Sequence, residues 1–384
     1  MRKILLIIAV GVVVGCGKKK SPEPQRNAPS TPKAEVENTD STKVVPEKLI
    51  TDPFVEREIR RQLGAFGQPE GELTMAYLEK VKSMDLTGSM RFGYEITDAS
   101  LKEVSKLHHL TQLHLRGTNI TDEGLKEVVK LKQLKELYLG ETQMTDAGLR
   151  EVAKRQQLTK LFLQDTKITD EGLKEVANLK NLTVLNIRGT KIANEAIKGL
   201  VELKQLQELY LTFTQISDEG LKDVADLQNL TVLNLSGTEI SDKGLKEVAK
   251  LEQLKELYLN GAHISDEGLK KVTEIKALTI LWLVGCTIIT DEGLKGVAEL
   301  KNLTFLGLGS TQTTDMGLKE VAKLENLTGL GLVDTNISDE GLKELVTLKK
   351  LKSLGLNNTK VTKAGVAELK KALPKCEIDS NPTK

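Results

Sequence analysis

The sequence has little of what marks most catalytic or cross-linked proteins. It holds three cysteines, four histidines, nine prolines and one tryptophan in 384 residues, and aromatic residues make up only 3% of it. Three cysteines cannot build a framework of several disulfide bonds. The formal net charge is +1, so the chain lacks the basic excess typical of nucleic-acid binding. Its longest apolar run, residues 5–14, covers only about ten residues and is too short for a mature membrane-spanning helix.

What the sequence does have is a repeat. The frame L-x-x-L-x-L-x-x-T, with some variation at its last position, recurs at a regular spacing, and only the step between Leu278 and Leu303 is one residue longer than the others. It opens at Leu110, Leu134, Leu158, Leu182, Leu206, Leu230, Leu254, Leu278, Leu303, Leu327 and Leu351. A fixed period of this length predicts a solenoid, in which each unit buries its apolar face against its neighbours.

One repeat predicts its own local structure. The alternation around Leu113 and Leu115 has the period of a half-buried strand. Thr121 then suits the N-cap of a helix in which Leu125 and Val128 recur at helical spacing. Each repeat is therefore expected to form a strand, a turn and a short helix. Stacking such units predicts an α/β horseshoe with a parallel sheet on its concave face and helices on its convex face.

This pattern resembles the leucine-rich repeat family, and the resemblance covers all eleven units. Threonine occupies the ninth position of most units, where the family often has asparagine or cysteine. The unit with the longer step has Cys286 there and is similar to the cysteine-containing subclass. We expect the threonine hydroxyls to bond backbone groups of the adjacent turn. Glycines that recur in the first helical turn, such as Gly124, suggest that backbone approaches backbone closely there.

The amino-terminal residues resemble a bacterial lipoprotein signal peptide. Arg2 and Lys3 precede the apolar run, which ends in Val-Val-Gly-Cys at Cys16. The resemblance implies removal of residues 1–15 and lipidation of Cys16, with two or three acyl chains holding the protein on a membrane. The absence of aspartate at position 17 favours the outer membrane or cell surface of a bacterial envelope. An ordinary secretory signal with an incidental cysteine is the alternative.

The remaining segments divide by composition. Residues 16–50 lack aromatic residues and are expected to form a disordered tether. Residues 51–86 resemble a helical amino-terminal cap with a first strand, with helices expected at about 53–63 and 74–82. Residues 87–374 are the repeats, and residues 375–384 a carboxyl-terminal cap and tail. Cys286 and Cys376 are expected to lie roughly 19 Å apart at the spacing of parallel strands, so we predict that both are unpaired.

The few aromatic residues of the repeats gather at outward-facing strand positions. Five of them, from Tyr138 to Trp282, share the position between the second and third leucines, and charged residues such as Lys135 and Glu256 border them. Together with a histidine at the same position and two phenylalanines nearby, they form a candidate ligand-binding surface: His114, Tyr138, Phe162, Tyr210, Phe213, Tyr258, Trp282 and Phe305. Apolar groups collected on one face typically mark a binding site. The alternative is that the rings pack against each other within the sheet.

The sequence does not support an enzymatic function. His108, His109 and His114 cluster, but no cysteine or carboxylate stands at metal-ligand spacing from them. There is no glycine-rich phosphate loop and no nucleophile motif, so we expect no catalytic residue, metal or cofactor. The sequence favours a lipid-anchored, exported protein that binds a macromolecule, with a protein as the preferred partner. An envelope glycan, or a role as a structural spacer or adhesin, is the alternative.

Overall fold

The second and third leucines of each frame, such as Leu113 and Leu115, alternate with outward-facing residues and produce a stack of short strands. The computed structural model of the chain describes residues 48–64, 71–87 and 95–382. Thirteen strands of three residues pair in parallel in chain order within this part. They are β1 (Ser83–Asp85), β2 (Gln112–His114), β3 (Glu136–Tyr138), β4 (Lys160–Phe162), β5 (Val184–Asn186), β6 (Glu208–Tyr210), β7 (Val232–Asn234), β8 (Glu256–Tyr258), β9 (Ile280–Trp282), β10 (Phe305–Gly307), β11 (Gly329–Gly331), β12 (Ser353–Gly355) and β13 (Glu377–Asp379).

A helix follows most of the strands. The helices are α1 (Pro53–Leu63), α2 (Met75–Leu78), α3 (Asp98–Val104), α4 (Asp122–Val128), α5 (Asp146–Val152), α6 (Asp170–Leu173), α7 (Asn194–Leu200), α8 (Asp218–Val224), α9 (Asp242–Val248), α10 (Asp266–Val272), α11 (Asp291–Val297), α12 (Asp315–Val321), α13 (Asp339–Glu344) and α14 (Lys363–Ala372), with 3-10 segments η3 (Lys174–Asn178) and η4 (Leu345–Thr347). In α4 the hydroxyl of Thr121 accepts from the backbone N–H of Glu123, which confirms the expected N-cap.

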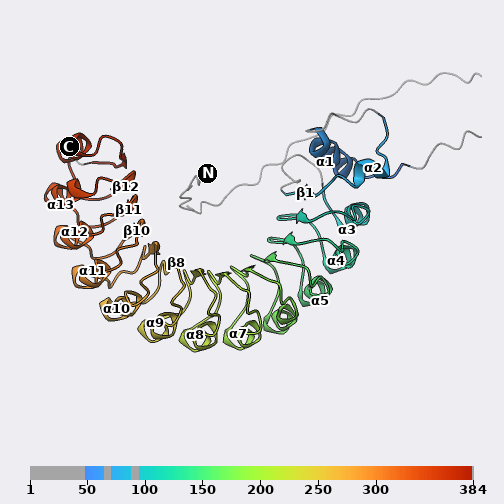
Figure 1. Cartoon of the computed structure of the whole chain (residues 1–384), viewed down its shortest axis with the longest axis horizontal. Coiled ribbons are helices and arrows are strands. Elements are labelled where there is room, and N and C mark those ends of the chain that lie inside the picture. The colour runs from blue at the N-terminus through green and yellow to red at the C-terminus, as the bar shows by residue number, and fades with distance from the viewer. Residues whose placement is uncertain (1–47, 65–70, 88–94, 383–384) are drawn as a thin grey trace, which may run out of the picture. The chain divides into compact units, whose positions relative to one another are not determined.

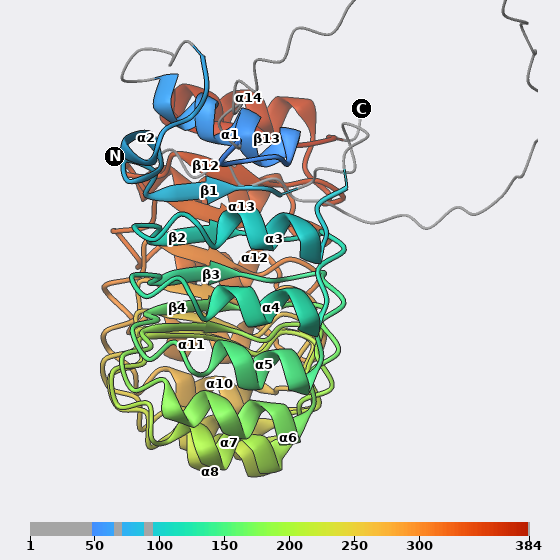
Figure 2. The ribbon, with the colours of Figure 1, turned by 90° about the vertical axis from the view of Figure 1, so that its right-hand side faces the viewer.

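The repeats stack as a curved solenoid. Figure 1 shows the strands along the inner side of its arc and helices α3 to α13 along the outer side, and Figure 2 shows β1 to β4 in one column beside the helices that follow them. The leucines of each frame lie between the two layers and are almost fully buried, as Leu110, Leu113 and Leu115 illustrate. The predicted leucine-rich repeat fold, with its sheet on the concave face, is therefore confirmed.

An aspartate in the first turn of most repeat helices ties that repeat to the next one. The carboxylate of Asp242 accepts from the backbone N–H of Ser265, at 2.8 Å, and from its hydroxyl, at 2.6 Å. The same pair of bonds forms at nine junctions between successive repeats: Asp98–Thr121, Asp122–Thr145, Asp146–Thr169, Asp218–Ser241, Asp242–Ser265, Asp266–Thr290, Asp291–Thr314, Asp315–Ser338 and Asp339–Thr362. This aspartate therefore stands at the start of its helix and also links neighbouring repeats.

These aspartates also explain the recurring glycines. A Cβ atom at Gly124 would lie 2.9 Å from Cγ of Asp98 and 3.0 Å from its Cα. The close neighbour is therefore mainly the linking carboxylate of the preceding repeat, whereas the sequence suggested backbone alone. One repeat departs from the pattern: Ala196 stands at the glycine position, and Ala193 can offer Asp170 only its backbone N–H, at 2.7 Å.

The buried threonines bond within their own repeat. The hydroxyl of Thr118 donates to the carbonyl of Leu115 at 2.6 Å, and the equivalent threonines repeat this contact. The expectation that they reach the adjacent turn was therefore wrong, because the carbonyl three residues earlier is nearer. Cys286 does reach the neighbouring repeat, since its thiol donates to the carbonyl of Leu259.

The ends of the solenoid are covered as the sequence suggested, with one difference. Helix α1 has the expected bounds, and β13 pairs with β12 at the other end. Helix α2 has four residues and is shorter than the expected 74–82, because the chain enters β1 at Ser83. Cys286 and Cys376 are buried and unpaired, as predicted. The predicted signal peptide, Cys16 and nearly all of the predicted tether lie outside the described residues. Within the described ranges, no helix is both long and apolar enough to cross a membrane.

Candidate binding surface on the concave face

The strand registers place six of the candidate rings in one row on the concave face. Phe305 instead aligns with Ile280 at the start of its strand, and Phe213 lies beyond the end of β6. Tyr138 aligns with Phe162 on the neighbouring strand, and Tyr258 aligns with Trp282. Because side chains alternate across a strand, a residue beside a buried leucine must point away from the core. All of these rings are at least partly exposed, as expected. The binding role assigned to them stays a prediction.

Most of the rings stack on their neighbours. In the first ladder, the ring of Tyr138 lies 3.9 Å from that of His114 and 4.4 Å from that of Phe162, centroid to centroid. The second ladder joins Tyr258 to Trp282 at 6.4 Å and Trp282 to Phe305 at 4.5 Å. The alternative in which rings pack against each other is thus realised within each ladder. Stacking holds the rings in place and leaves part of each one open to solvent.

Glycines support the end of the second ladder. A Cβ atom at Gly307 would lie 2.7 Å from the Trp282 ring, and one at Gly329 would collide with the Phe305 ring. Each ring therefore lies over the glycine of the following strand. Gly307 of β10 and Gly329 of β11 thus make room for the aromatic residues beside them.

Each tyrosine of the row is held by a glutamate on its own strand. The hydroxyl groups of Tyr138, Tyr210 and Tyr258 donate to the glutamates two residues earlier, at 2.8–3.0 Å. Burial, together with the Glu136 carboxylate, raises the pKa of Tyr138 to about 12. The same causes raise the pKa values of Tyr210 and Tyr258. The tyrosines therefore stay protonated near neutral pH and present neutral rings.

The middle of the row differs from the two ladders. Asparagines flank Tyr210 on both neighbouring strands, Asn186 on β5 and Asn234 on β7. No aromatic ring within the described residues stacks on Tyr210, whose neighbours in the row are the two asparagines. A cavity of about 440 Å³ opens here, and we call it the central hollow. It is lined by Asn186, Arg188, Tyr210, Thr212, Phe213, Asn234, Ser236 and Asn260.

Phe213 stands out at the edge of the central hollow. It is the most exposed large apolar side chain of the described residues, at 62%. Its backbone is left-handed, with φ of 56°. The equivalent position of the other repeats holds glycine or a small or acidic residue, such as Gly237, Ser310 or Asp334. A bulky side chain is disfavoured in this conformation, and such strain often marks a functional site.

The polar lining of the central hollow was not among the predicted site residues. Arg188, Thr212, Ser236 and Asn260 all occupy the seventh position of their repeats. That position also faces outward, so tabulating it along the repeats would have revealed them. The rim lysines and glutamates, including Lys160, which pairs with Glu136 at 3.2 Å, border the rings as expected.

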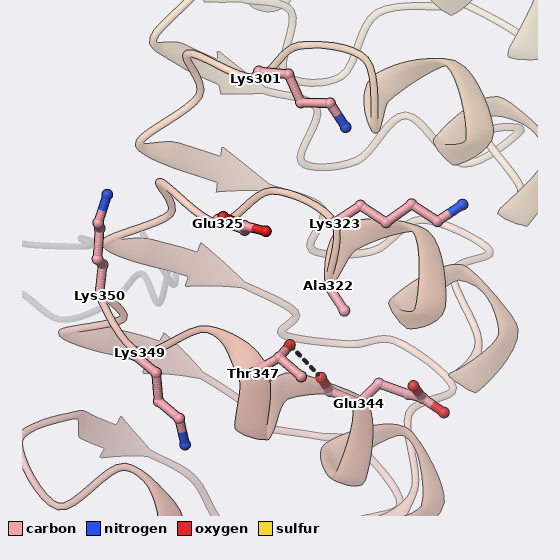
Figure 3. A pocket seen from close by; sticks show the side chains of 8 residues that line it. All are labelled: Lys301, Ala322, Lys323, Glu325, Glu344, Thr347, Lys349 and Lys350. Carbon is pink, nitrogen blue, oxygen red and sulfur yellow. Dashed lines mark hydrogen bonds between the residues drawn. The ribbon is translucent and has the colours of Figure 1, made fainter.

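Another hollow lies away from the concave row, among the loops of the last repeats. Its lining residues are Lys301, Ala322, Lys323, Glu325, Glu344, Thr347, Lys349 and Lys350. Figure 3 shows that its lysine side chains point in different directions and do not meet at one point. Lys323 pairs with Glu320, and Lys350 donates to Asn326. We therefore take the concave row as the candidate site. No group of three His, Cys, Asp or Glu in the described ranges could hold a metal.

Comparisons with known proteins agree with this architecture. A family model described as "Leucine Rich repeat" matches residues 106–129, 156–177, 204–225, 226–249 and 252–272. An internalin of Listeria monocytogenes is 22% identical, with a TM-score of 0.62, and the match covers 90% of this chain and all of that one. A leucine-rich repeat protein of Leptospira interrogans is 23% identical, with a TM-score of 0.52, over 79% of this chain and 97% of its own. No curated protein gives a significant match. The matched repeats and the parallel sheet together show that the described part of the chain has the leucine-rich repeat solenoid fold.

Proposed function

We propose that this protein binds another protein through the aromatic row of its concave face. The observation that carries the proposal is the placing of partly exposed rings at one register position along β2 to β9, with exposed Phe213 in the middle. Leucine-rich repeat solenoids are typically protein-interaction modules, and the long curved sheet offers an extended surface. Tyrosine and tryptophan are enriched among the residues that dominate protein interfaces.

Stacking within the two ladders suits the rings for contact. A ring that already stacks on its neighbour loses little further freedom when a partner covers its edge, which lowers the entropic cost of binding. Charged side chains at the border, such as Lys135 and Lys255, lie in solvent and can select a partner of complementary charge. This mechanism is recognition without chemistry.

We further propose that the protein works at a bacterial membrane surface, attached through lipid on Cys16. The apolar run and the Val-Val-Gly-Cys sequence support this, and both lie outside the described residues. The sequence predicts a tether of about 30 residues before the repeats, and a tether of that length would give them a reach of roughly 30 Å.

The binding proposal predicts that replacing Tyr210, Tyr258 and Trp282 together by alanine weakens partner binding by at least about tenfold, because interface rings carry much of the affinity. The partner is first captured by crosslinking in the native envelope and identified by mass spectrometry. Its affinity for the purified wild-type and variant chains is then measured by calorimetry. The unfolding midpoint of each variant is recorded in parallel.

A matched control replaces three other exposed apolar residues, Met75, Ile288 and Met316, by alanine. None of these lies in a strand, so binding should be unchanged. Equal affinity of the ring variant and the control would refute the concave row as the binding surface. If no protein is captured, and the wild type binds a polysaccharide array while the ring variant does not, the glycan alternative is favoured instead.

Lipid attachment predicts that Cys16→Ser moves the protein from the membrane fraction to the soluble fraction. Two or three acyl chains anchor a protein stably, and serine lacks the sulfur that carries them. Fractionation with an immunoblot, together with incorporation of a labelled fatty acid, measures both effects. Cys286→Ser serves as the control, because that thiol is buried in the repeats. Unlabelled wild-type protein would contradict the proposal.

A further inference from the structure

The polar groups of the central hollow are mainly hydrogen-bond donors. The side-chain oxygens of Asn186, Asn234 and Asn260 accept from backbone N–H groups of Arg188, Ser236 and Val284, each at 3.0 Å. An amide oxygen engaged in this way leaves its NH₂ group as the free end of the side chain. These NH₂ groups have no acceptor among the described residues, and no carboxylate lines the hollow.

The charge of Arg188 also has no acidic partner within the described part of the chain, and a comparison between repeats shows why. Arg116 stands at the equivalent position of the first full repeat and pairs with Glu141 of the next repeat, at 2.6 Å. Phe213 occupies, relative to Arg188, the position that Glu141 occupies relative to Arg116. Arg188 therefore has a phenylalanine where Arg116 has its glutamate partner. The Arg188 guanidinium lies over the Phe213 ring, 5.7 Å from its centroid. An aromatic ring holds a guanidinium in place without neutralising it. Arg188 thus lines the hollow without an ion pair to any acidic side chain of the described residues.

From these contacts we propose that the central hollow is a subsite for a carboxylate group of the protein partner. The carboxylate would accept from the Arg188 guanidinium and from the neighbouring asparagine NH₂ groups, while the apolar part of its side chain lies on the Tyr210 ring. Charged hydrogen bonds of this kind are stronger than neutral ones and fix orientation. The inference rests on the proposed function and names the chemistry that its surface selects.

The position of the hollow favours a glutamate or aspartate side chain over a chain terminus. It lies between the two aromatic ladders, with His114 to Phe162 on one side and Tyr258 to Phe305 on the other. A partner that covers both ladders places the middle of its contact surface over the hollow. We therefore expect it to present a side chain there, and not a chain terminus.

The test is an NMR titration of the purified full-length chain with N-acetyl-glutamate N-methylamide, which carries the glutamate side chain without free termini. We expect saturable shifts of the Arg188 side-chain N–H and of the asparagine NH₂ signals at about millimolar concentration, as a probe of this size allows. The isosteric glutamine probe should bind at least about fivefold more weakly, because it lacks the charge.

Arg188→Gln should weaken the binding of the glutamate probe by at least about fivefold. Arg116→Gln, the control at the equivalent position, should leave its affinity unchanged, because that arginine already pairs with Glu141. Equal binding of the two probes, or no effect of Arg188→Gln, would overturn the proposal. Binding of N-acetyl-glycine alone, whose only carboxylate is terminal, would overturn the choice of a side chain.

The outcome is separable from that of the proposed function. If the ring variant loses its partner but the glutamate probe does not bind, only the carboxylate subsite is wrong. If the probe binds at Arg188 and the ring variant keeps its partner, the subsite stands and the aromatic row is not the binding surface.

Discussion

Replacing Ile289 by alanine should lower the free energy of unfolding by about 2–5 kcal/mol, as for other large buried aliphatic residues. Ile289 is fully buried in the turn before α11, between the sheet and the helix layer. The substitution shortens the side chain to a methyl group and leaves a cavity that the neighbouring repeats cannot fill without shifting. Because each repeat is held mainly by its neighbours, the loss acts on the contacts at both interfaces of this unit. Urea denaturation followed by circular dichroism measures the change.

The neighbouring residue provides a control of identical chemistry. Ile288 is 45% exposed, and it is adjacent in sequence to Ile289 within the longest repeat. Ile288→Ala should change the free energy of unfolding by no more than about 0.5 kcal/mol, as is usual for surface positions. Similar losses for both variants would mean that the side chains of this turn are not divided between core and solvent as described.

Gly268→Ala should destabilise the solenoid by about 1–3 kcal/mol, although alanine is the better helix former. The added Cβ atom would lie 2.7 Å from Cγ of Asp242 and 3.1 Å from its Cα, so the carboxylate must move. Moving it strains both of its bonds to Ser265. Hydrogen bonds to a charged group contribute about 1.5–3 kcal/mol each, which exceeds the roughly 0.8 kcal/mol that alanine gains in helix propensity.

Gly199→Ala tests the same exchange where space is available. Gly199 lies in α7, and a Cβ atom there would come no closer than 3.9 Å to its neighbours. This variant should gain about 0.5–1 kcal/mol from helix propensity alone. The two variants are compared by denaturant titration under one set of conditions. A gain for both variants would show that the linking aspartate gives way freely and that the glycines are not required for close packing.

The regular parts of the fold could be predicted from the sequence because the same spacing of residues recurs in every repeat. The strands, the N-cap at Thr121, the bounds of α1 and the two unpaired cysteines were all predicted correctly. Errors arose where one local contact competes with another. The hydroxyl of Thr118 takes the carbonyl of its own repeat, and α2 is shorter than its pattern suggested. Sequence periodicity cannot rank such alternatives, because each of them is compatible with the same spacing of residues.

The candidate surface also has parts that the sequence predicted and parts that it did not. The sequence located its rings, since a residue between two inward leucines of a strand must face outward. It did not locate the central hollow, which depends on residues from several successive repeats. Nor did it reveal that Phe213 replaces the equivalent of Glu141 beside an arginine, because this exchange is visible only when the two positions of successive repeats are known to touch.

The sequence by itself determined that the chain coils as a leucine-rich solenoid and which side of each strand meets water, because both follow from a spacing repeated along most of its length. Only the tertiary structure decided which outward side chains are neighbours. It joined most of the rings into two ladders and placed Tyr210 and Arg188 between them, because the parallel register brings together residues that are distant along the chain.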